Sequence, residues 1–282
     1  MRFQIDENVA KSALIKRSPD SDKLTVGTML SICGSYGMAG AAIMSSLAAL
    51  RSGIGLLKLC VPERLYPIMA AAVPEAVFIP VENYNDFDFE SKSRFCSSVL
   101  IGCGLGINDG TRSVVRKVVT QCTVPAVIDA DALNIVAEDT DILLGAKSRL
   151  ILTPHEREFS RLTGIEVDEI RRNREEHALR FAEKYGVVLV LKGHHTIVAS
   201  PNGDLWINEC RGNAGMACGG SGDVLAGIIA SLTAQNPQPL KTACAGVYIH
   251  AAAGDCARDE YGEISMLPTD TISMLPKIFK TL

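Results

Sequence analysis

Short apolar runs alternate along the chain with longer segments in which apolar residues recur every three or four positions. The runs are rich in Val, Ile and Leu and nearly free of charge, which is typical of parallel strands buried on both faces. They predict strands over residues 24–33, 55–61, 76–80, 98–102, 125–129, 149–153 and 187–192. The intervening segments predict crossover helices over residues 39–52, 110–121, 131–137 and 167–185. The alternation predicts an α/β fold with a mostly parallel central sheet.

The pattern changes after the last of these strands. Residues 196–199 and 205–208 flank the turn sequence Pro-Asn-Gly-Asp, which predicts an antiparallel hairpin. Three further helices are expected at 222–235, at 240–259 and from Thr269 onward. No linker, repeat or low-complexity segment interrupts the chain, so residues 1–282 are expected to form a single domain.

One 27-residue run, from Leu24 to Leu50, contains no Asp, Glu, Lys, Arg or His. Its length exceeds what a bilayer-spanning helix needs, and the mean hydropathy of the chain is +0.17. Small and polar residues, however, break its first half, including Gly34, Gly37 and Gly40. The run therefore predicts a strand, a glycine turn and a helix, and not a membrane span.

Composition excludes several classes of protein. The 28 basic and 32 acidic residues give a net charge of −4, and no basic block provides a nucleic-acid footprint. The nine cysteines include no CxxC pair, and Arg2, Asp6 and Glu7 interrupt any signal peptide at the start. We expect reduced, mostly buried thiols in a cytoplasmic protein, without a nucleic-acid or membrane partner.

The strongest chemical signal is the segment NAGMACGGSGDVL, residues 213–225. Gly219, Gly220 and Gly222 surround Ser221, Asp223 follows, and the next dozen residues are helical in pattern. Backbone amides at a helix N-terminus that no side chain covers form a site for phosphate or developing negative charge. Asp223 could act as a plain helix cap, but a cap does not need three glycines before it.

Two earlier glycine motifs follow predicted strands. GSYGMAG, residues 34–40, opens a helix and includes Ala39 and Gly40, while GCGLG, residues 102–106, includes Gly104 and Gly106. Either turn could admit a ligand close to the backbone, although a strand-to-helix turn alone is a weak signal. The GxGxG spacing lacks the later glycine and the acidic residue of a dinucleotide fingerprint, so it argues only weakly for a Rossmann oxidoreductase.

Two further motifs lie at strand ends, where open α/β sheets gather ligands. In DADALN, Asp129 and Asp131 end a strand, although Asp131 and Asn134 could equally cap the next helix. In TPHERE, a neutral His155 could donate a hydrogen bond to a substrate, and Pro154 stops the strand before a helix begins.

The motif KGHHT, residues 192–196, ends another strand, and Lys192 could pair with a nucleotide phosphate. His194 and His195 do not suggest a zinc pair, because adjacent strand residues point to opposite faces. His250, inside a predicted helix, is expected to pack in the core.

These six motifs occur in the order and with the spacing of the ADP- or ATP-dependent NAD(P)H-hydrate dehydratases, and the chain resembles that family from about residue 26 to residue 255. The resemblance implies a ribokinase-like three-layer α/β/α sandwich. It assigns Ala39, Gly40, Gly104, Gly106, His155 and Asp223 to the hydrated dinucleotide, and Lys192, Gly193, His194, His195, Thr196 and Gly222 to ADP. It also places Glu158 where related kinases carry an acid that organises a magnesium-bound water.

The resemblance further implies a reaction. ADP would phosphorylate the ring hydroxyl of the S epimer of NADHX or NADPHX, Asp223 would accept the hydroxyl proton, and the amides of Gly220 to Gly222 would hold the charge. Elimination of phosphate would then restore NADH or NADPH and release AMP, with Mg²⁺ shielding the phosphates. ATP remains open as an alternative donor.

Two other functions are compatible with the same loops. A kinase for a vitamin or sugar alcohol would retain the glycine loop and the acid, and a nucleotide sensor would bind ADP or ATP without turnover. The resemblance also implies a homotetramer that works with an epimerase for the hydrate. Only about 25 residues precede the first expected strand, so we expect that epimerase to be a separate chain.

Overall fold

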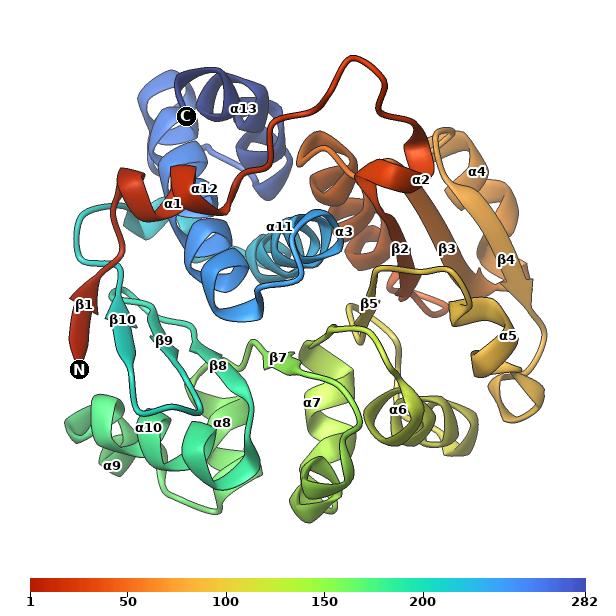
Figure 1. Cartoon of the computed structure of the whole chain (residues 1–282), viewed down its shortest axis with the longest axis horizontal. Coiled ribbons are helices and arrows are strands. Elements are labelled where there is room, and N and C mark those ends of the chain that lie inside the picture. The colour runs from red at the N-terminus through yellow and green to blue at the C-terminus, as the bar shows by residue number, and fades with distance from the viewer.

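One ten-stranded sheet runs through the computed structural model, which describes residues 1–282 (Figure 1). Its order is β1-β10-β9-β8-β7-β6-β5-β2-β3-β4. The strands are β1 (Arg2–Gln4), β2 (Thr28–Ile32), β3 (Leu56–Pro62), β4 (Val77–Val81), β5 (Ser98–Ile101), β6 (Ala126–Ile128), β7 (Leu150–Leu152), β8 (Val188–Leu191), β9 (Ile197–Ala199) and β10 (Leu205–Ile207). All neighbours pair in parallel except β9, which is antiparallel to both β8 and β10. The mostly parallel sheet and the antiparallel hairpin of β9 and β10 are confirmed.

Helices cover both faces of the sheet and bury one hydrophobic cluster on each (Figure 1). One layer contains α1 (Glu7–Ala13), α3 (Ala39–Arg51), α4 (Tyr66–Ala72), α11 (Ser221–Gln235), α12 (Pro239–Tyr261) and α13 (Pro268–Thr281). The other contains α5 (Phe89–Ser93), α6 (Asp109–Gln121), α7 (Ala130–Val136), α8 (Glu156–Thr163), α9 (Val167–Arg172) and α10 (Arg174–Tyr185). Together with the sheet they form the expected three-layer α/β/α sandwich.

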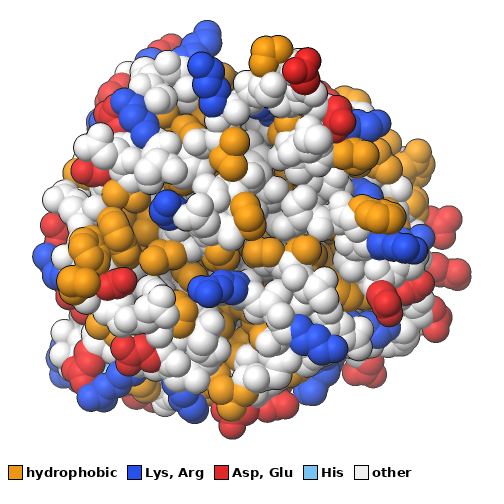
Figure 2. All heavy atoms as spheres, viewed as in Figure 1, with side chains coloured by type: hydrophobic (Ala, Val, Ile, Leu, Met, Phe, Trp, Pro, Cys, Tyr) orange, Lys and Arg blue, Asp and Glu red, His pale blue; other side chains and the backbone are white.

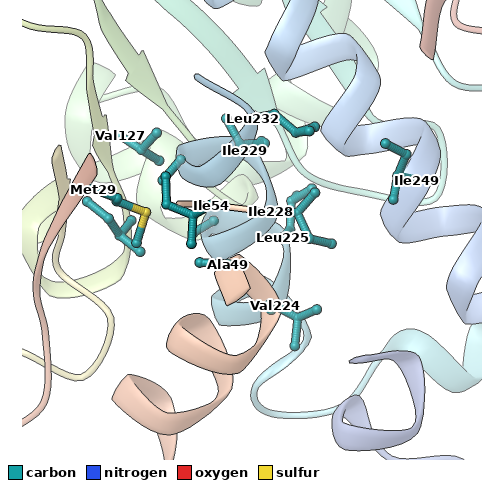
Figure 3. Close-up of a cluster of buried hydrophobic side chains, with 14 of the residues drawn as sticks. Met29, Ala49, Ile54, Val127, Val224, Leu225, Ile228, Ile229, Leu232 and Ile249 are labelled. Atoms are coloured by element: carbon teal, nitrogen blue, oxygen red, sulfur yellow. The ribbon is translucent and has the colours of Figure 1, made fainter. Parts of the chain in front are cut away.

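Helix α11 lies at the centre of the first layer (Figure 3). Every residue from Val224 to Ala234 is buried, because α3, α12 and strand β5 surround the helix. A helix that is apolar all round is typical of such a central position. At Gly227 the backbone of α3 comes so close that an added Cβ would stand 2.1 Å from the Ser45 carbonyl oxygen. The glycine loop before α11 is therefore fixed to a rigid, buried helix.

The strand expected at 24–33 begins only at Thr28, because residues Lys23–Val26 form the short helix α2. Asp22 caps this helix by accepting hydrogen bonds from the amides of Leu24 and Thr25. The apolar residues alone predicted a longer strand, but the cap at Asp22 starts a helical turn in their place. The run from Leu24 to Leu50 is otherwise a buried strand, a glycine turn and a helix, as predicted. No helix in the structure has the length and apolar character that crossing a bilayer requires.

Other elements differ from expectation. The helix expected over 167–185 is divided at Asn173, whose backbone (φ −129°, ψ 42°) separates α9 from α10. Strand β1 and helices α1 and α4 were not predicted, and β1 also makes the expectation of about 25 residues before the first strand wrong. A three-residue strand carries too little periodicity to be recognised, and β1 exists because it pairs with β10 at the sheet edge.

The surface agrees with the charge pattern of the sequence. On the face shown in Figure 2, Lys and Arg side chains are interspersed with Asp and Glu side chains. Six of the nine cysteines are buried, whereas Cys210 and Cys218 are exposed and Cys256 is intermediate, and all nine are free thiols.

Candidate active site

The glycine loop meets α11 as the sequence predicts. Gly220 is the N-cap with φ 105°, a left-handed conformation, and a Cβ there would stand 2.4 Å from the Met44 Cε. The positive φ favours glycine, and any larger residue would also have to move the end of the Met44 side chain. The amides of Gly222 and Asp223, in the first turn, have no acceptor within the chain. These donors, at the positive end of the helix dipole, form a site for an anion.

Asp223 stands beside this site in an environment that favours its protonated form. Burial, and then the negative charge of Asp129, raise its pKa from 3.8 to about 6. A hydrogen bond from Cys103 and the charge of Lys192 act in the opposite direction. A carboxyl group with a pKa close to neutrality is suited to accept a proton and release it again.

Lys192 lies between the anion site and the end of the sheet. Its Nζ donates to Asp129 Oδ1 at 2.8 Å and lies 3.9 Å from Glu158 Oε2. The Nζ also lies 3.1 Å from where a Cβ at Gly222 would stand, so glycine leaves room for the ammonium group. Burial alone would lower the Lys192 pKa, but the charges of Asp129 and Glu158 outweigh it and raise the pKa, so the group stays cationic.

These groups share one cavity of about 820 Å³. It joins the ends of β6, β7 and β8 to the glycine loop and to one face of α12. The lining comprises Asp129, Ala130, His155, Lys192, Gly193, His194, Thr196, Asn208, Arg211, Gly212, Asn213, Ala214, Met216, Ala217, Cys218, Gly219, Gly220, Ser221, Gly222, Asp223, Leu225, Val247, His250 and Ala251. The volume suits a nucleotide-sized ligand.

His155 is the N-cap of α8. Its Nδ1 accepts hydrogen bonds from the amides of Arg157 and Glu158, each at 3.1 Å, so the ring is neutral and carries its proton on Nε2. Burial, together with the charge of Lys192, lowers the His155 pKa and favours this state. The Nε2 lies 3.5 Å from Glu158 Oε1, so the proton on this nitrogen stands beside a carboxylate.

The structure offers no closed cage for magnesium. The side chains of Cys103, Asp129 and Asp223 bring one ligand atom each within 4.8 Å of one another, but a thiol is a poor Mg²⁺ ligand and Asp129 is paired with Lys192. Glu158 Oε2 accepts from the His155 amide at 2.8 Å. This donor set fits an ion that is bound mainly by nucleotide phosphates and water, with Glu158 as an outer contact.

The two histidines of KGHHT lie in a turn after β8, and the expectation that they occupy a strand and point to opposite faces is wrong. Their rings stack, with centroids 4.3 Å apart. His194 lines the large cavity, whereas His195 lines a separate cavity beside Arg174. Of the five residues expected to contact ADP in this motif, Lys192, Gly193, His194 and Thr196 border the large cavity.

The two earlier glycine motifs pack directly against each other. A Cβ at Gly104 would meet the Met38 carbonyl oxygen at 2.9 Å, and the Gly106 amide donates to Asp131 Oδ2 at 2.8 Å. Ala39 and Gly40 begin α3 beside them. Four of the six residues expected at the dinucleotide thus lie together outside the lining of the large cavity, whereas the other two, His155 and Asp223, belong to that lining.

Several lining residues escaped the sequence interpretation. His250, expected in the core, is only 9% exposed, yet its Nε2 lies 3.3 Å from Ser221 Oγ and its ring borders the cavity. Val247 and Ala251 lie on the same face of α12, three residues before it and one after. Burial and Lys192 lower the His250 pKa to about 4, so it is neutral. This helix is apolar around most of its surface, so the pattern does not distinguish a cavity face from a core face.

Comparison with known proteins agrees with this geometry. The family model for NAD(P)H-hydrate dehydratase matches residues 29–277. An ADP-dependent (S)-NAD(P)H-hydrate dehydratase of Bacillus subtilis is 34% identical over 278 residues, covering 99% of this chain and 98% of the relative. The chain spans about half the length of the bifunctional NAD(P)H-hydrate repair enzymes that it also matches.

Solved structures share the whole architecture. The ADP/ATP-dependent NAD(P)H-hydrate dehydratase of B. subtilis, co-crystallised with ATP and Mg²⁺, superposes with a TM-score of 0.89 at 31% identity, covering 99% of this chain and 98% of that one. A ribokinase-like superfamily protein of Enterococcus faecalis gives 0.88 at 27% identity, with 99% and 96% covered. The glycine loop, the acid behind it and these full-length similarities lead to one conclusion: the chain belongs to the NAD(P)H-hydrate dehydratase family.

Proposed function

We propose that this chain dehydrates the S epimer of NADHX and NADPHX, the 6-hydrated forms of NADH and NADPH, with ADP as phosphoryl donor. The observation that carries the proposal is the position of Asp223, a partly protonated carboxyl group beside two free amides of α11 in a nucleotide-sized cavity. The name of the B. subtilis relative supports ADP as the donor and the hydrate as the substrate.

The chemistry assigns each group a step. Asp223 accepts the proton of the ring hydroxyl as its oxygen attacks the β-phosphorus of ADP, and the bond to the bridging oxygen breaks to give AMP. The amides of Gly220 and Gly222 and the Lys192 ammonium stabilise the charge on the transferred group, whereas the Ser221 amide, expected to share this role, donates to the Cys218 carbonyl at 3.2 Å. Phosphate then leaves the ring together with the adjacent ring proton, driven by the nitrogen lone pair, and the double bond of the dihydronicotinamide is restored.

The remaining site residues bind and orient. Gly193, His194 and Thr196 hold the adenosine part of ADP, and His195, which lines the separate cavity, does not take part. The two glycine turns, with Ala39, Gly40, Gly104 and Gly106, hold the hydrated dinucleotide, and His155 donates to it from Nε2. Glu158 would hold a water of a magnesium ion carried by the nucleotide, and that ion would neutralise phosphate charge during transfer.

The proposal extends to the cellular setting. Nine free thiols suit a reducing cytoplasm, and an enzyme that accepts only the S epimer requires an epimerase to supply it from the R form. A homotetramer is part of the same proposal, and light scattering of the purified protein measures it.

The direct test uses hydrate made from NADH in acid. Incubation with the protein, Mg²⁺ and ADP should restore the near-ultraviolet absorbance of dihydronicotinamide, with one AMP and one phosphate released for each NADH formed. Omission of nucleotide is the control, and ATP replaces ADP in a parallel reaction. A phosphorylated hydrate that accumulates would indicate a kinase instead, and nucleotide binding without any product would indicate a sensor.

A further inference from the structure

Asp129, at the end of β6, accepts more side-chain contacts than any other carboxylate that lines the cavity, and none of the proposed steps of the reaction uses it directly. It is 1% exposed. Oδ1 accepts from Thr153 Oγ1 at 2.7 Å and from Lys192 Nζ at 2.8 Å, and Oδ2 lies 3.6 Å from Cys103 Sγ. A buried carboxylate with three partners is fixed in position, and it must be compensated by a cation.

The backbone around Asp129 is also specialised. Ala130 has φ 48°, in the left-handed region that a residue with a side chain rarely adopts. Gly102, on the neighbouring strand end, approaches so closely that a Cβ there would stand 1.9 Å from the Asp129 carbonyl oxygen. Strain of this kind persists only where the surrounding structure enforces it, and it concentrates at functional positions.

The partner that matters most for chemistry is Lys192. A free lysine side chain has many rotamers, but here Nζ is held between Asp129 and the start of α11, and the side chain is only 18% exposed. The ammonium group therefore stands beside the free amides of Gly222 and Asp223 before any nucleotide arrives. Such preorganisation lowers the cost of binding an anion there.

We propose that Asp129 is a positioning residue for phosphoryl transfer, and that its carboxylate holds the Lys192 ammonium at the N-terminus of α11, where the phosphate of ADP binds. This inference rests on the proposed function for the identity of the nucleotide. Asp129 acts through Lys192 and does not itself contact the reacting atoms.

Asp129 has a second effect, on Asp223. The five ionisable groups that influence Asp223 come from four places in the fold, and they are Cys33, Cys103, Asp129, Asp131 and Lys192. Among them, the charge of Asp129 raises the Asp223 pKa the most, after burial. Loss of the Asp129 charge should therefore lower the Asp223 pKa, so that the ionised base persists to lower pH.

The test is a double-mutant cycle of ADP affinity by titration calorimetry, on the full chain with Asp129→Asn, Lys192→Met and both together. Loss of a hydrogen bond to a charged group predicts about a tenfold weaker affinity for Asp129→Asn. Because Asp129 acts through Lys192, the double variant should bind ADP no more weakly than Lys192→Met alone. Affinity losses that multiply, or wild-type affinity in Asp129→Asn, would overturn the proposal.

A pH profile separates positioning from plain structural support. The acid limb of kcat/KM for hydrate dehydration should lie near pH 6 in the wild type and move to lower pH in Asp129→Asn. An unmoved limb would contradict the inference. Thr242→Val, which removes a buried hydroxyl that bonds to Thr233 at 2.8 Å, is a remote destabilised control and should change neither ADP affinity nor the limb.

The stability of each variant is measured alongside its ADP affinity. Asp129→Asn leaves the Lys192 charge buried with only the more distant Glu158 as a partner, so thermal melts accompany each measurement. Thr153→Val removes only the hydroxyl that orients Asp129, and it should weaken ADP binding in the same direction even if Asp129→Asn does not fold. Unchanged ADP affinity in Thr153→Val would count against the proposal that Asp129 positions Lys192. Calorimetry of ADP binding needs no hydrate. A wild-type protein that binds ADP but does not dehydrate the hydrated dinucleotide would therefore refute the proposed function, and the role of Asp129 in holding Lys192 could still be tested.

Discussion

At the scale of single residues, the site depends on carboxyl groups held in unlike surroundings. Asp129 is buried but paired with a lysine, so its charge is compensated. Asp223 faces the cavity without a cation in direct contact, and burial with the nearby Asp129 charge raises its pKa to about 6. Two acids of the same type thereby take different tasks, one holding a cation and the other exchanging a proton.

Asp223→Asn should lower hydrate dehydration by about 10²-fold or more, since it removes the proton acceptor while keeping the shape. The same change should stabilise the fold above pH 6. The folded-state pKa exceeds 3.8, so the stability contributed by Asp223 is present at low pH and is lost as the pH rises through about 6. The gain at pH 7.5 should be on the order of 2 kcal/mol by urea denaturation and should vanish near pH 4. Turnover close to wild type would show that Asp223 is not the proton acceptor.

At the scale of elements, helix α11 connects the hydrophobic core to the anion site. Its body is buried among α3, α12 and the sheet, and its first turn provides the free amides. Each of two glycines at this end has a separate reason: Gly220 adopts a left-handed backbone against Met44, and Gly222 leaves space for Lys192. The helix thus presents a preformed anion site on a support that cannot shift easily.

Gly222→Ala tests this arrangement. The added methyl would stand 3.1 Å from Lys192 Nζ, so the ammonium should be displaced and the ADP dissociation constant should rise by about tenfold. The melting temperature should not fall, because alanine is a better helix former than glycine. Gly219→Ala, whose methyl would meet no atom within 4 Å, is the matched control in the same loop. Equal effects of the two changes would contradict the role given to Lys192.

At the scale of the whole molecule, the two ends of the chain are fastened to the same structure. Strand β1 pairs with β10, Asn236 Nδ2 donates to the Ala13 carbonyl at 2.9 Å, and α1 packs on α12. One sheet separates two hydrophobic clusters that share every central strand. We therefore propose that residues 1–282 form a single domain.

A single domain should unfold in one step. Scanning calorimetry of the full chain should show one cooperative transition. ADP at about 100 times its dissociation constant should add roughly 2.7 kcal/mol of stability and shift that transition as a unit. Two transitions, of which ADP shifts only one, would divide the chain into separate domains.

Features that depend on residues close together in the chain could be predicted from the sequence. Strands buried on both faces appear as uncharged Val, Ile and Leu runs, and glycines before an acid and an apolar helix predict an anion loop, because the residues responsible are neighbours in the chain. The positions of Gly220, Gly222 and Asp223 follow from this reasoning, and the structure places them as expected.

Tertiary structure decided what depends on distant residues. Lys192 meets Asp129 across 63 positions, β1 exists only through its pairing with β10, and His250 faces the cavity although its helix is apolar on most sides. Periodicity within a segment fixes which residues are buried, but not against what they are buried. The partners are decided when the parallel strands bring their carboxyl ends to one edge of the sheet. Only there does Lys192 lie beside Asp129, does Ala130 adopt its strained backbone, and does Gly102 come close to the Asp129 carbonyl.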